Sequence, residues 1–175
     1  LSTFPVVAVN NTMMLVLLLA CLLMLLPRVL KTWPIGLLLL LAVFVSEPRQ
    51  PLPENSVVID VIDVDQGLSV LIQTASHQLL VDTGSAWPEG SMVERAVKPY
   101  LLQQGIRELD KVIISHLDND HAGGIYDLLE SFTVKEVSSS EPVEGIDTVA
   151  CKAGQQWRWD GVDFRILHPD DAGKY

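Results

Sequence analysis

The chain has 175 residues and a formal net charge of −10, which leaves room for one domain and an appendage. The charge is uneven, because residues 1–47 carry three charged groups while the remainder holds ten of the twelve Lys and Arg and 21 of the 22 Asp and Glu, a formal net charge of −11. This acidic segment lacks the basic surface typical of nucleic-acid binders, and the presence of only Cys21 and Cys151 excludes a zinc–cysteine cluster.

Two uncharged, almost wholly apolar runs occupy residues 12–26 and 33–45. They are apolar on every face, unlike an amphipathic core helix, and two runs are not typical of a signal peptide. Each run is shorter than the about 20 residues that span a bilayer. The first run extends backward, however, and Trp33 is a suitable interface anchor for the second. We therefore expect residues 1–47 to form a membrane hairpin at the end of a polytopic membrane region.

Arg28 and Lys31 lie between the two runs, and short loops rich in Lys and Arg remain in the cytoplasm. Both outer ends of the hairpin, and with them the acidic segment, are therefore expected to face away from the cytoplasm. The chain begins at Leu1 and not at Met, so we also expect it to be a piece of a longer protein. Residues 48–55 contain three prolines and are predicted to be a linker.

Residues 56–175 predict an α/β domain of the layered α+β kind. Helical spacing predicts a helix over residues 93–104, which Pro99 kinks or restarts and Gly105 ends. A second helix is expected after Gly123-Gly124. Runs of β-branched or alternating residues predict strands at 57–63, 68–73, 78–81, 111–115, 133–137, 156–159 and 162–167, the last two joined by a two-residue turn at Asp160-Gly161.

Four potential metal ligands, His116, Asp118, Asp120 and His121, fall within six residues directly after a predicted buried strand. Imidazole and carboxylate together suit Zn²⁺, Mn²⁺ or iron. In an irregular turn His116 and Asp118 can face one ion, and Asp120 and His121 can reach a second ion about 4 Å away. Two ions so placed activate a water for attack on a phosphate or acyl centre. The alternative is a polar loop whose aspartates only cap the following helix.

The segment Ser115–Gly124 resembles the HxHxDH loop of metallo-β-lactamase-fold hydrolases, with Asp118 in place of the second His. Together with Asp63–Gly67 and Leu80–Gly84, this loop is similar to that of ComEC-type competence proteins, polytopic inner-membrane proteins of natural transformation. The resemblance covers nearly all of residues 13–175. It implies the N-terminal half of a metallo-β-lactamase-like αββα domain, preceded by two membrane helices and truncated at its C-terminus.

The resemblance also implies roles for individual residues. His116 and Asp118 would bind the first of two divalent ions, Zn or Mn, and Asp120 and His121 the second. Asp120 is in addition the candidate catalytic residue. Asp82 would stand behind the ligands and brace their loop.

The chain departs from the family pattern at one turn residue and in its number of metal ligands. Asp65 stands where the family motif has Gly, and this departure bears on the shape of that turn. The later ligands of the family would lie beyond Tyr175, although Leu167-His168-Pro169 resembles a later strand end. We therefore expect at most half of the metal site here, and no hydrolase activity from the isolated chain.

Several other residues have a functional and a plainer interpretation. Trp157 and Trp159 alternate on a strand and can stack bases, but this spacing on a hairpin favours core or partner contacts. His77 is expected to be solvated in a turn, and His168 to be structural. Trp87 lies on a loop near the predicted site and is a candidate substrate contact.

The resemblance implies a DNA-uptake protein whose outward domain is a metal-dependent nuclease acting on the strand that is not imported. Its expected partners are DNA, the membrane and other components of the uptake apparatus. One alternative is another membrane-tethered metallo-hydrolase, acting on an ester, a lactam or a small phosphate, because one fold supports many chemistries. The other is a non-catalytic module that uses the fold to bind DNA or a channel partner.

Overall fold

The structure, a computed structural model, describes residues 11–26, 32–45 and 52–169. It separates into two compact units, residues 1–50 and 51–175. Arg28 and Lys31, on which the expected membrane topology rests, lie outside the described residues, as does part of the linker predicted at 48–55.

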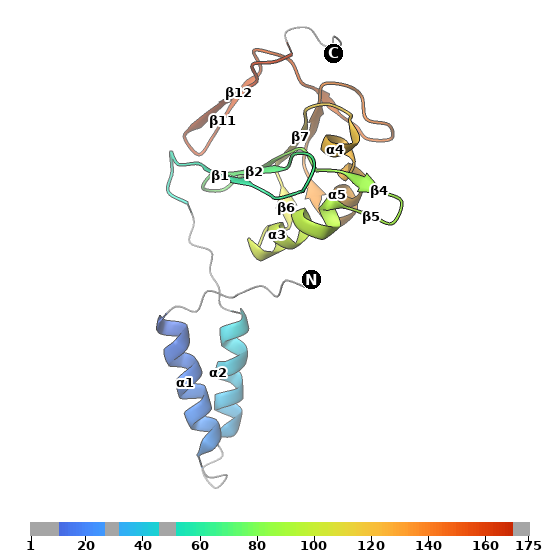
Figure 1. Cartoon of the computed structure of the whole chain (residues 1–175). Helices are drawn as coiled ribbons and strands as arrows, with labels where there is room; N and C mark the ends of the chain where they lie inside the picture. Colours follow the sequence, from blue (N-terminus) through green and yellow to red (C-terminus); the bar gives the residue numbers. More distant parts are fainter. Residues whose placement is uncertain (1–10, 27–31, 46–51, 170–175) are drawn as a thin grey trace. The chain divides into compact units, whose positions relative to one another are not determined.

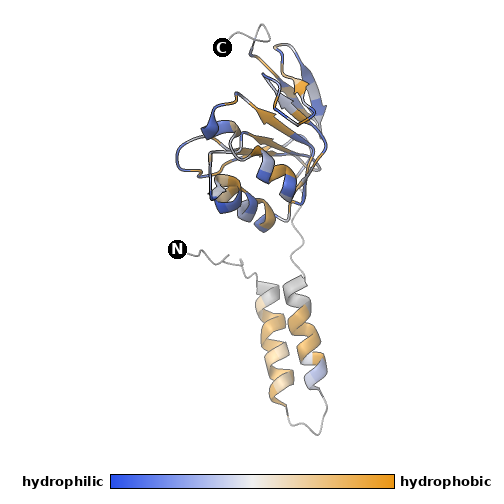
Figure 2. Ribbon diagram, turned by 90° about the vertical axis from the view of Figure 1, so that its right-hand side faces the viewer, coloured by the Kyte–Doolittle hydropathy of each residue, from blue (hydrophilic) through white to orange (hydrophobic). Residues whose placement is uncertain are grey.

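The first unit is a pair of apolar helices, α1 (Asn11–Leu25) and α2 (Trp33–Val45). Figure 2 shows most of both helices in the colour of hydrophobic residues. They approach closely at Gly36, where a Cβ atom would lie 2.8 Å from the Ala20 carbonyl oxygen. At about 1.5 Å per residue, both are shorter than the about 30 Å of a bilayer core. Among the described helices, none combines the length and the apolar character needed to cross a membrane, so the two membrane helices expected from the sequence are not supported.

The second unit is built on a six-stranded mixed sheet in the order β1-β2-β3-β7-β9-β10 (Figure 1). β1, β2 and β3 pair antiparallel, whereas β3, β7, β9 and β10 run parallel to one another. The strands are β1 (Val58–Val61), β2 (Val70–Gln73), β3 (Gln78–Val81), β7 (Lys111–Ile114), β9 (Val137–Ser139) and β10 (Val149–Ala150).

Helices cover one face of this sheet (Figure 1). A π-helical turn (Val93–Val97) runs directly into α3 (Lys98–Gln103), and α5 (Ile125–Ser131) lies beside them. Pro99 stands in the first turn of α3, which matches the expected restart of the helix. The buried core contains sheet residues Leu71, Leu80, Val112 and Ile114 and helix residues Val93, Val97, Leu101, Ile125 and Leu128. Full burial of one such side chain contributes about 1.5–3 kcal/mol.

Short elements complete this side of the unit. β4 (Ala86–Trp87) and β5 (Gly90–Ser91) form a small hairpin before the π-helical turn. β6 (Glu108–Leu109) pairs in parallel with β8 (Thr133–Val134). The mixed α/β fold expected from the sequence is confirmed. β8 lies within the strand predicted at 133–137, whereas β4, β5, β6 and β10 are additions to the prediction.

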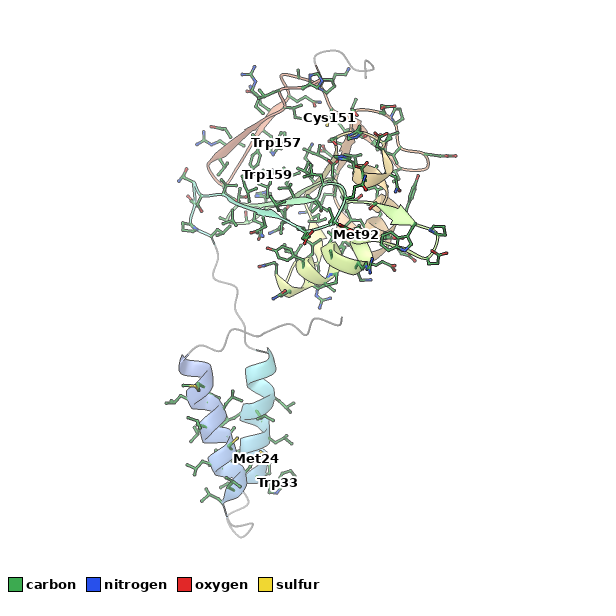
Figure 3. All side chains as sticks on the ribbon, in the orientation of Figure 1. Met24, Trp33, Met92, Cys151, Trp157 and Trp159 are labelled. Carbon is green, nitrogen blue, oxygen red and sulfur yellow. The ribbon has the colours of Figure 1, made fainter. Side chains whose placement is uncertain are left out.

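A separate hairpin, β11 (Gln156–Trp159) and β12 (Val162–Arg165), lies against the other face of the sheet. Its turn residues Asp160 and Gly161 have φ values of 49° and 85°, the backbone conformation that a two-residue turn requires. Figure 3 shows Trp157 and Trp159 projecting from β11 toward the sheet. Lys111, which alternates with the helix-facing Val112, places its Nζ 4.9 Å from the Trp157 ring centroid, and this fixes the side on which the hairpin packs.

Candidate metal centre

The candidate site forms where two neighbouring parallel strands end. Val81, the last residue of β3, pairs with Ile113 of β7, so Asp82 and Ser115 leave the sheet side by side. The ligand loop His116–His121 follows at once, and the short helix α4 (Asn119–Ala122) begins inside it. Chemistry at the carboxyl ends of parallel strands is typical of open α/β sheets.

Asp82 supplies a buried carboxylate behind the loop. Its side chain is 0% exposed, and its backbone takes a φ of 60°, a left-handed conformation that Asp tolerates better than most residues. Ser115 donates to it twice, from the backbone N–H to Oδ1 at 2.8 Å and from Oγ to Oδ2 at 2.7 Å. The Nδ1 of His121 lies 2.8 Å from Oδ2. Asp82 thus braces the loop through both neighbouring segments.

These hydrogen bonds decide which nitrogen of each imidazole is available. His121 donates its Nδ1–H to Asp82, which leaves Nε2 with a free lone pair. The Ser115 hydroxyl donates its one hydrogen to Asp82. Its Oγ therefore accepts a hydrogen bond from His116 Nδ1, 3.0 Å away. His116 Nε2 is therefore also left with a lone pair. A carboxylate or hydroxyl behind the far nitrogen is the usual support of a metal-binding histidine.

Donor atoms of His116, Asp120 and His121 lie within 4.8 Å of one another, which makes these three a potential metal-ion cluster in the described part of the chain. Asp120 Oδ2 is 3.7 Å from His121 Nε2, and Asp118 Oδ2 is 3.4 Å from His116 Nε2. Two donors on one tetrahedral Zn²⁺, each about 2.0–2.1 Å from the ion, are about 3.3–3.4 Å apart. The chemistry and spacing of the donors present fit divalent ions.

Asp118 stands apart from the other three. It occupies the N-cap position of α4 and makes no side-chain capping hydrogen bond, so the simple capping role considered for it is not seen. Its side chain is 79% exposed and belongs to no common cluster with Asp120 and His121. The Asp118 carboxylate lies 3.4 Å from His116 Nε2.

Hydrogen bonds from two segments hold the backbone of the loop: the turn between β1 and β2, and the residues that follow β3. Leu68 N–H donates to the Asp120 carbonyl at 3.2 Å, and Thr83 N–H donates to the His121 carbonyl at 2.7 Å. Gly67, at a φ of 125°, lies so close that a Cβ there would be 2.1 Å from the Asp120 carbonyl oxygen. Asp65 takes a φ of 59°, so the Asp that replaces the family Gly adopts the left-handed conformation that such a Gly allows.

A hollow of about 390 Å³ opens beside the loop and is lined by Gln66, Ser85, Ala86, Trp87, Asn119 and Asp120. Trp87 comes from the β4–β5 hairpin, which the sequence did not predict, and lies next to the ligand loop as expected. Ala86 N–H donates to Asn119 Oδ1 at 3.3 Å and so ties this hairpin to α4.

The remaining candidates belong to the sheet–hairpin contact. Trp157 stacks on Phe164 with ring centroids 5.1 Å apart, and Trp159 stacks on His77 at 4.8 Å. Their faces are thus used within the protein, which supports the packing interpretation over base stacking. His77 is 33% exposed, so it is partly solvated as expected, but its Nδ1 also lies 3.0 Å from Asp160 Oδ2, a contact that the sequence did not predict.

Hydrogen bonds lower the pKa of two carboxylates at this contact. The hydrogen bond from His77, followed by those from Thr74 and Ser76, holds the pKa of Asp160 well below its usual range. On the same side of the sheet, the hydrogen bond from Lys111 lowers the pKa of Glu136. Both groups lie on the hairpin side, and neither belongs to the cluster of His116, Asp120 and His121.

Comparison with known proteins places the site in a family context. Residues 62–145 match the metallo-beta-lactamase superfamily. The chain is 38% identical to competence protein ComA of Neisseria gonorrhoeae over 98% of its own length and 25% of that protein. It is 43% identical to recombination protein 2 of Haemophilus influenzae over 65% of the chain and 15% of that protein. It is 30% identical to ComE operon protein 3 of Bacillus subtilis over 64% of the chain and 18% of that protein. The chain spans a quarter or less of these curated relatives.

Proposed function

We propose that this chain, which matches the metallo-beta-lactamase superfamily over residues 62–145 and is similar to competence proteins, acts in DNA uptake as a metal-dependent nuclease. The domain hydrolyses phosphodiester bonds of the strand that is not imported. The observation that carries the proposal is the grouping of donor atoms from His116, Asp120 and His121 within 4.8 Å, above the buried carboxylate of Asp82.

In this proposal His116 and Asp118 hold one divalent ion, Zn or Mn, and Asp120 and His121 hold a second. Bound ions supply an activated water and stabilise the oxygens of the phosphodiester. The part of the protein is positioning: Asp82 fixes the His121 ring, and Ser115 fixes the His116 ring. Asp120, which lines the adjoining hollow, is the ligand nearest to an arriving substrate.

The acidity of the domain supports a role for the ions in binding as well as in catalysis. Residues after 47 carry a formal net charge of −11, which repels the phosphate backbone of DNA. Cations held at the loop offset this repulsion where the substrate must approach. Binding of DNA by this domain is therefore expected to depend on divalent ions.

We also propose that the protein resides in the bacterial inner membrane with the acidic unit outside the cytoplasm, together with other components of an uptake apparatus. Support comes from large apolar side chains exposed on both helices, among them Leu15 (68%), Leu25 (84%) and Leu38 (69%). Such surfaces are stable only where they are removed from water.

A cleavage assay tests the nuclease. It uses the longer protein of which this chain is expected to be a piece, on duplex DNA with each strand labelled in turn. We expect cleavage of a strand with Mn²⁺ or Zn²⁺, loss of cleavage with EDTA, and loss in the Asp120→Asn variant. Asp147→Asn is the matched control, because this aspartate is exposed and lies outside the ligand loop. Unchanged cleavage by Asp120→Asn would contradict the assigned residue. Binding without cleavage, whatever the metal, would favour a non-catalytic DNA-binding module.

A further inference from the structure

Beside the ligand loop, one tryptophan borders two hollows. Trp87 in the β4–β5 hairpin is 37% exposed. It lines the hollow of about 390 Å³ that contains Asp120 and a second of about 390 Å³ that contains Arg95 and Glu94. The indole thus has the candidate metal loop on one side and the start of a helix on the other.

Arg95 contacts the indole at the second hollow. Its guanidinium carbon lies 5.6 Å from the Trp87 ring centroid, within the range of a cation–π contact. Arg95 lines the second hollow and not the one that contains Asp120. The part of the indole that borders the hollow with Asp120 is available to a flat partner, while the contact with Arg95 limits rotation of the indole.

Two further contacts fix the position of Trp87 relative to the loop. Ala86 N–H donates to Asn119 Oδ1 at 3.3 Å, so the strand that carries the indole is attached to the neighbour of Asp120. At the turn, Trp87 pairs with Gly90 across the β4–β5 hairpin, which holds the backbone that carries the indole. The Trp87 indole therefore lines the hollow in a fixed position.

We propose that Trp87 stacks on a nucleobase of a single-stranded segment of the DNA substrate, next to the phosphate at the Asp120 loop. This inference rests on the proposed nuclease function. The chemistry favours it because an acidic domain gains little from phosphate contacts, whereas the flat face of a base is neutral. Stacking also tolerates any base, as a degrading enzyme requires. The amides of Gln66 and Asn119, which line the same hollow, suit the polar edge of a base.

The test compares the binding of two probes to the full chain in Ca²⁺: a labelled oligothymidylate, and an abasic oligonucleotide of equal length with the same phosphates. We expect Trp87→Ala to weaken oligothymidylate binding about tenfold and to leave abasic binding unchanged. Trp87→Phe should retain most of the affinity. Trp33→Ala is the matched control, because it removes an exposed tryptophan from α2 and should bind both probes like the parent.

The outcomes separate this inference from the function on which it rests. A loss confined to the base-containing probe supports stacking at Trp87. Equal binding of oligothymidylate by the parent and Trp87→Ala, or an equal loss for both probes, overturns the stacking and leaves the nuclease proposal standing. Failure of the parent to bind either probe overturns both, since the substrate would then not be DNA.

Discussion

Asp82 is the residue on which the geometry of the ligand loop depends most. It is fully buried and accepts three hydrogen bonds, two from Ser115 and one from His121. An ionised carboxylate accepts all of them, whereas an amide presents N–H groups to two of the same donors. Its position at the end of a parallel strand makes it the support of both imidazoles.

Replacement of Asp82 by Asn should therefore weaken metal binding about 10- to 100-fold, the usual effect of losing a partner behind a histidine ligand. Competition with a chelating dye measures the affinity. Asp110→Asn is the control: this aspartate is also largely buried and bonds to Gln78 and Lys135, away from the loop. Parent-like affinity in the Asp82 variant would show that the buried carboxylate is not needed.

For the residues of the site, the sequence could reveal the types of ligand but not the histidine tautomers or the burial of Asp82. The sequence predicts a pairing of His116 with Asp118 and of Asp120 with His121. His116 Nε2 lies 3.4 Å from Asp118 Oδ2, but His116 also belongs to one cluster with Asp120 and His121, so the division between two ions stays a prediction. The Ser115 hydroxyl was missed, although Ser directly precedes His116. Nothing in the local pattern indicates that a hydroxyl will lie between two imidazoles and a carboxylate from another strand.

The turn between β1 and β2 supports the ligand loop through its backbone and not through a side chain. Leu68 binds the Asp120 carbonyl, and Gly67 allows the two backbones to touch. A side chain at Gly67 would collide with backbone atoms, which cannot swing away as a flexible side chain can.

Gly67→Ala should therefore displace the ligand loop, lower the free energy of unfolding by more than about 2 kcal/mol, and reduce metal affinity. Gly105→Ala is a matched comparison, since Gly105 also has a positive φ (72°) but nothing within 4 Å of an added Cβ. That variant should cost only the about 1–2 kcal/mol of a left-handed backbone and leave metal affinity intact. Urea unfolding and metal titration check both, and equal effects of the two changes would count against the close contact.

The β11–β12 hairpin is held to the sheet by hydrogen bonds to Asp160 from Thr74, Ser76 and His77. Because these contacts lower the Asp160 pKa in the folded state, their contribution is complete above the unfolded pKa, about 3.9. It is lost as the pH falls through the folded value.

Asp160→Asn should thus reduce the free energy of unfolding more at pH 6 than at pH 3. Asp163→Asn, an exposed change in the same hairpin, should have little effect at either pH. Urea unfolding at both pH values gives the comparison. The same loss from Asp160→Asn at both pH values would mean that ionisation of Asp160 does not hold the hairpin.

Element prediction succeeded where periodicity was strong. The strands expected at 68–73, 78–81 and 111–115 appear as β2, β3 and β7, and the helix at 93–104 appears as a π-helical turn joined to α3. The two-residue strands β4, β5, β6 and β10 were not predicted, because they contain too few residues to show a periodic pattern. Their pairing depends on tertiary contacts, and so the hairpin that carries Trp87 could not be foreseen.

For the whole molecule, the sequence predicts that the acidic unit lies outside the cytoplasm, because Arg28 and Lys31 separate the two apolar runs. An alkaline phosphatase reporter, which is active only outside the cytoplasm, should work when fused after Tyr175. The same reporter inserted between Arg28 and Lys31 should be silent. The opposite pattern would reverse the proposed orientation.

Elemental analysis tests most directly whether the loop after β7 is a metal centre, when it is made on the purified longer protein of which this chain is expected to be a piece. We expect bound divalent metal, up to about two ions per chain, and loss of this metal in the double variant His116→Ala/His121→Ala with the fold retained by circular dichroism. His168→Ala, a change outside the loop, should keep the metal. Equal metal content in the parent and the double variant would contradict the account.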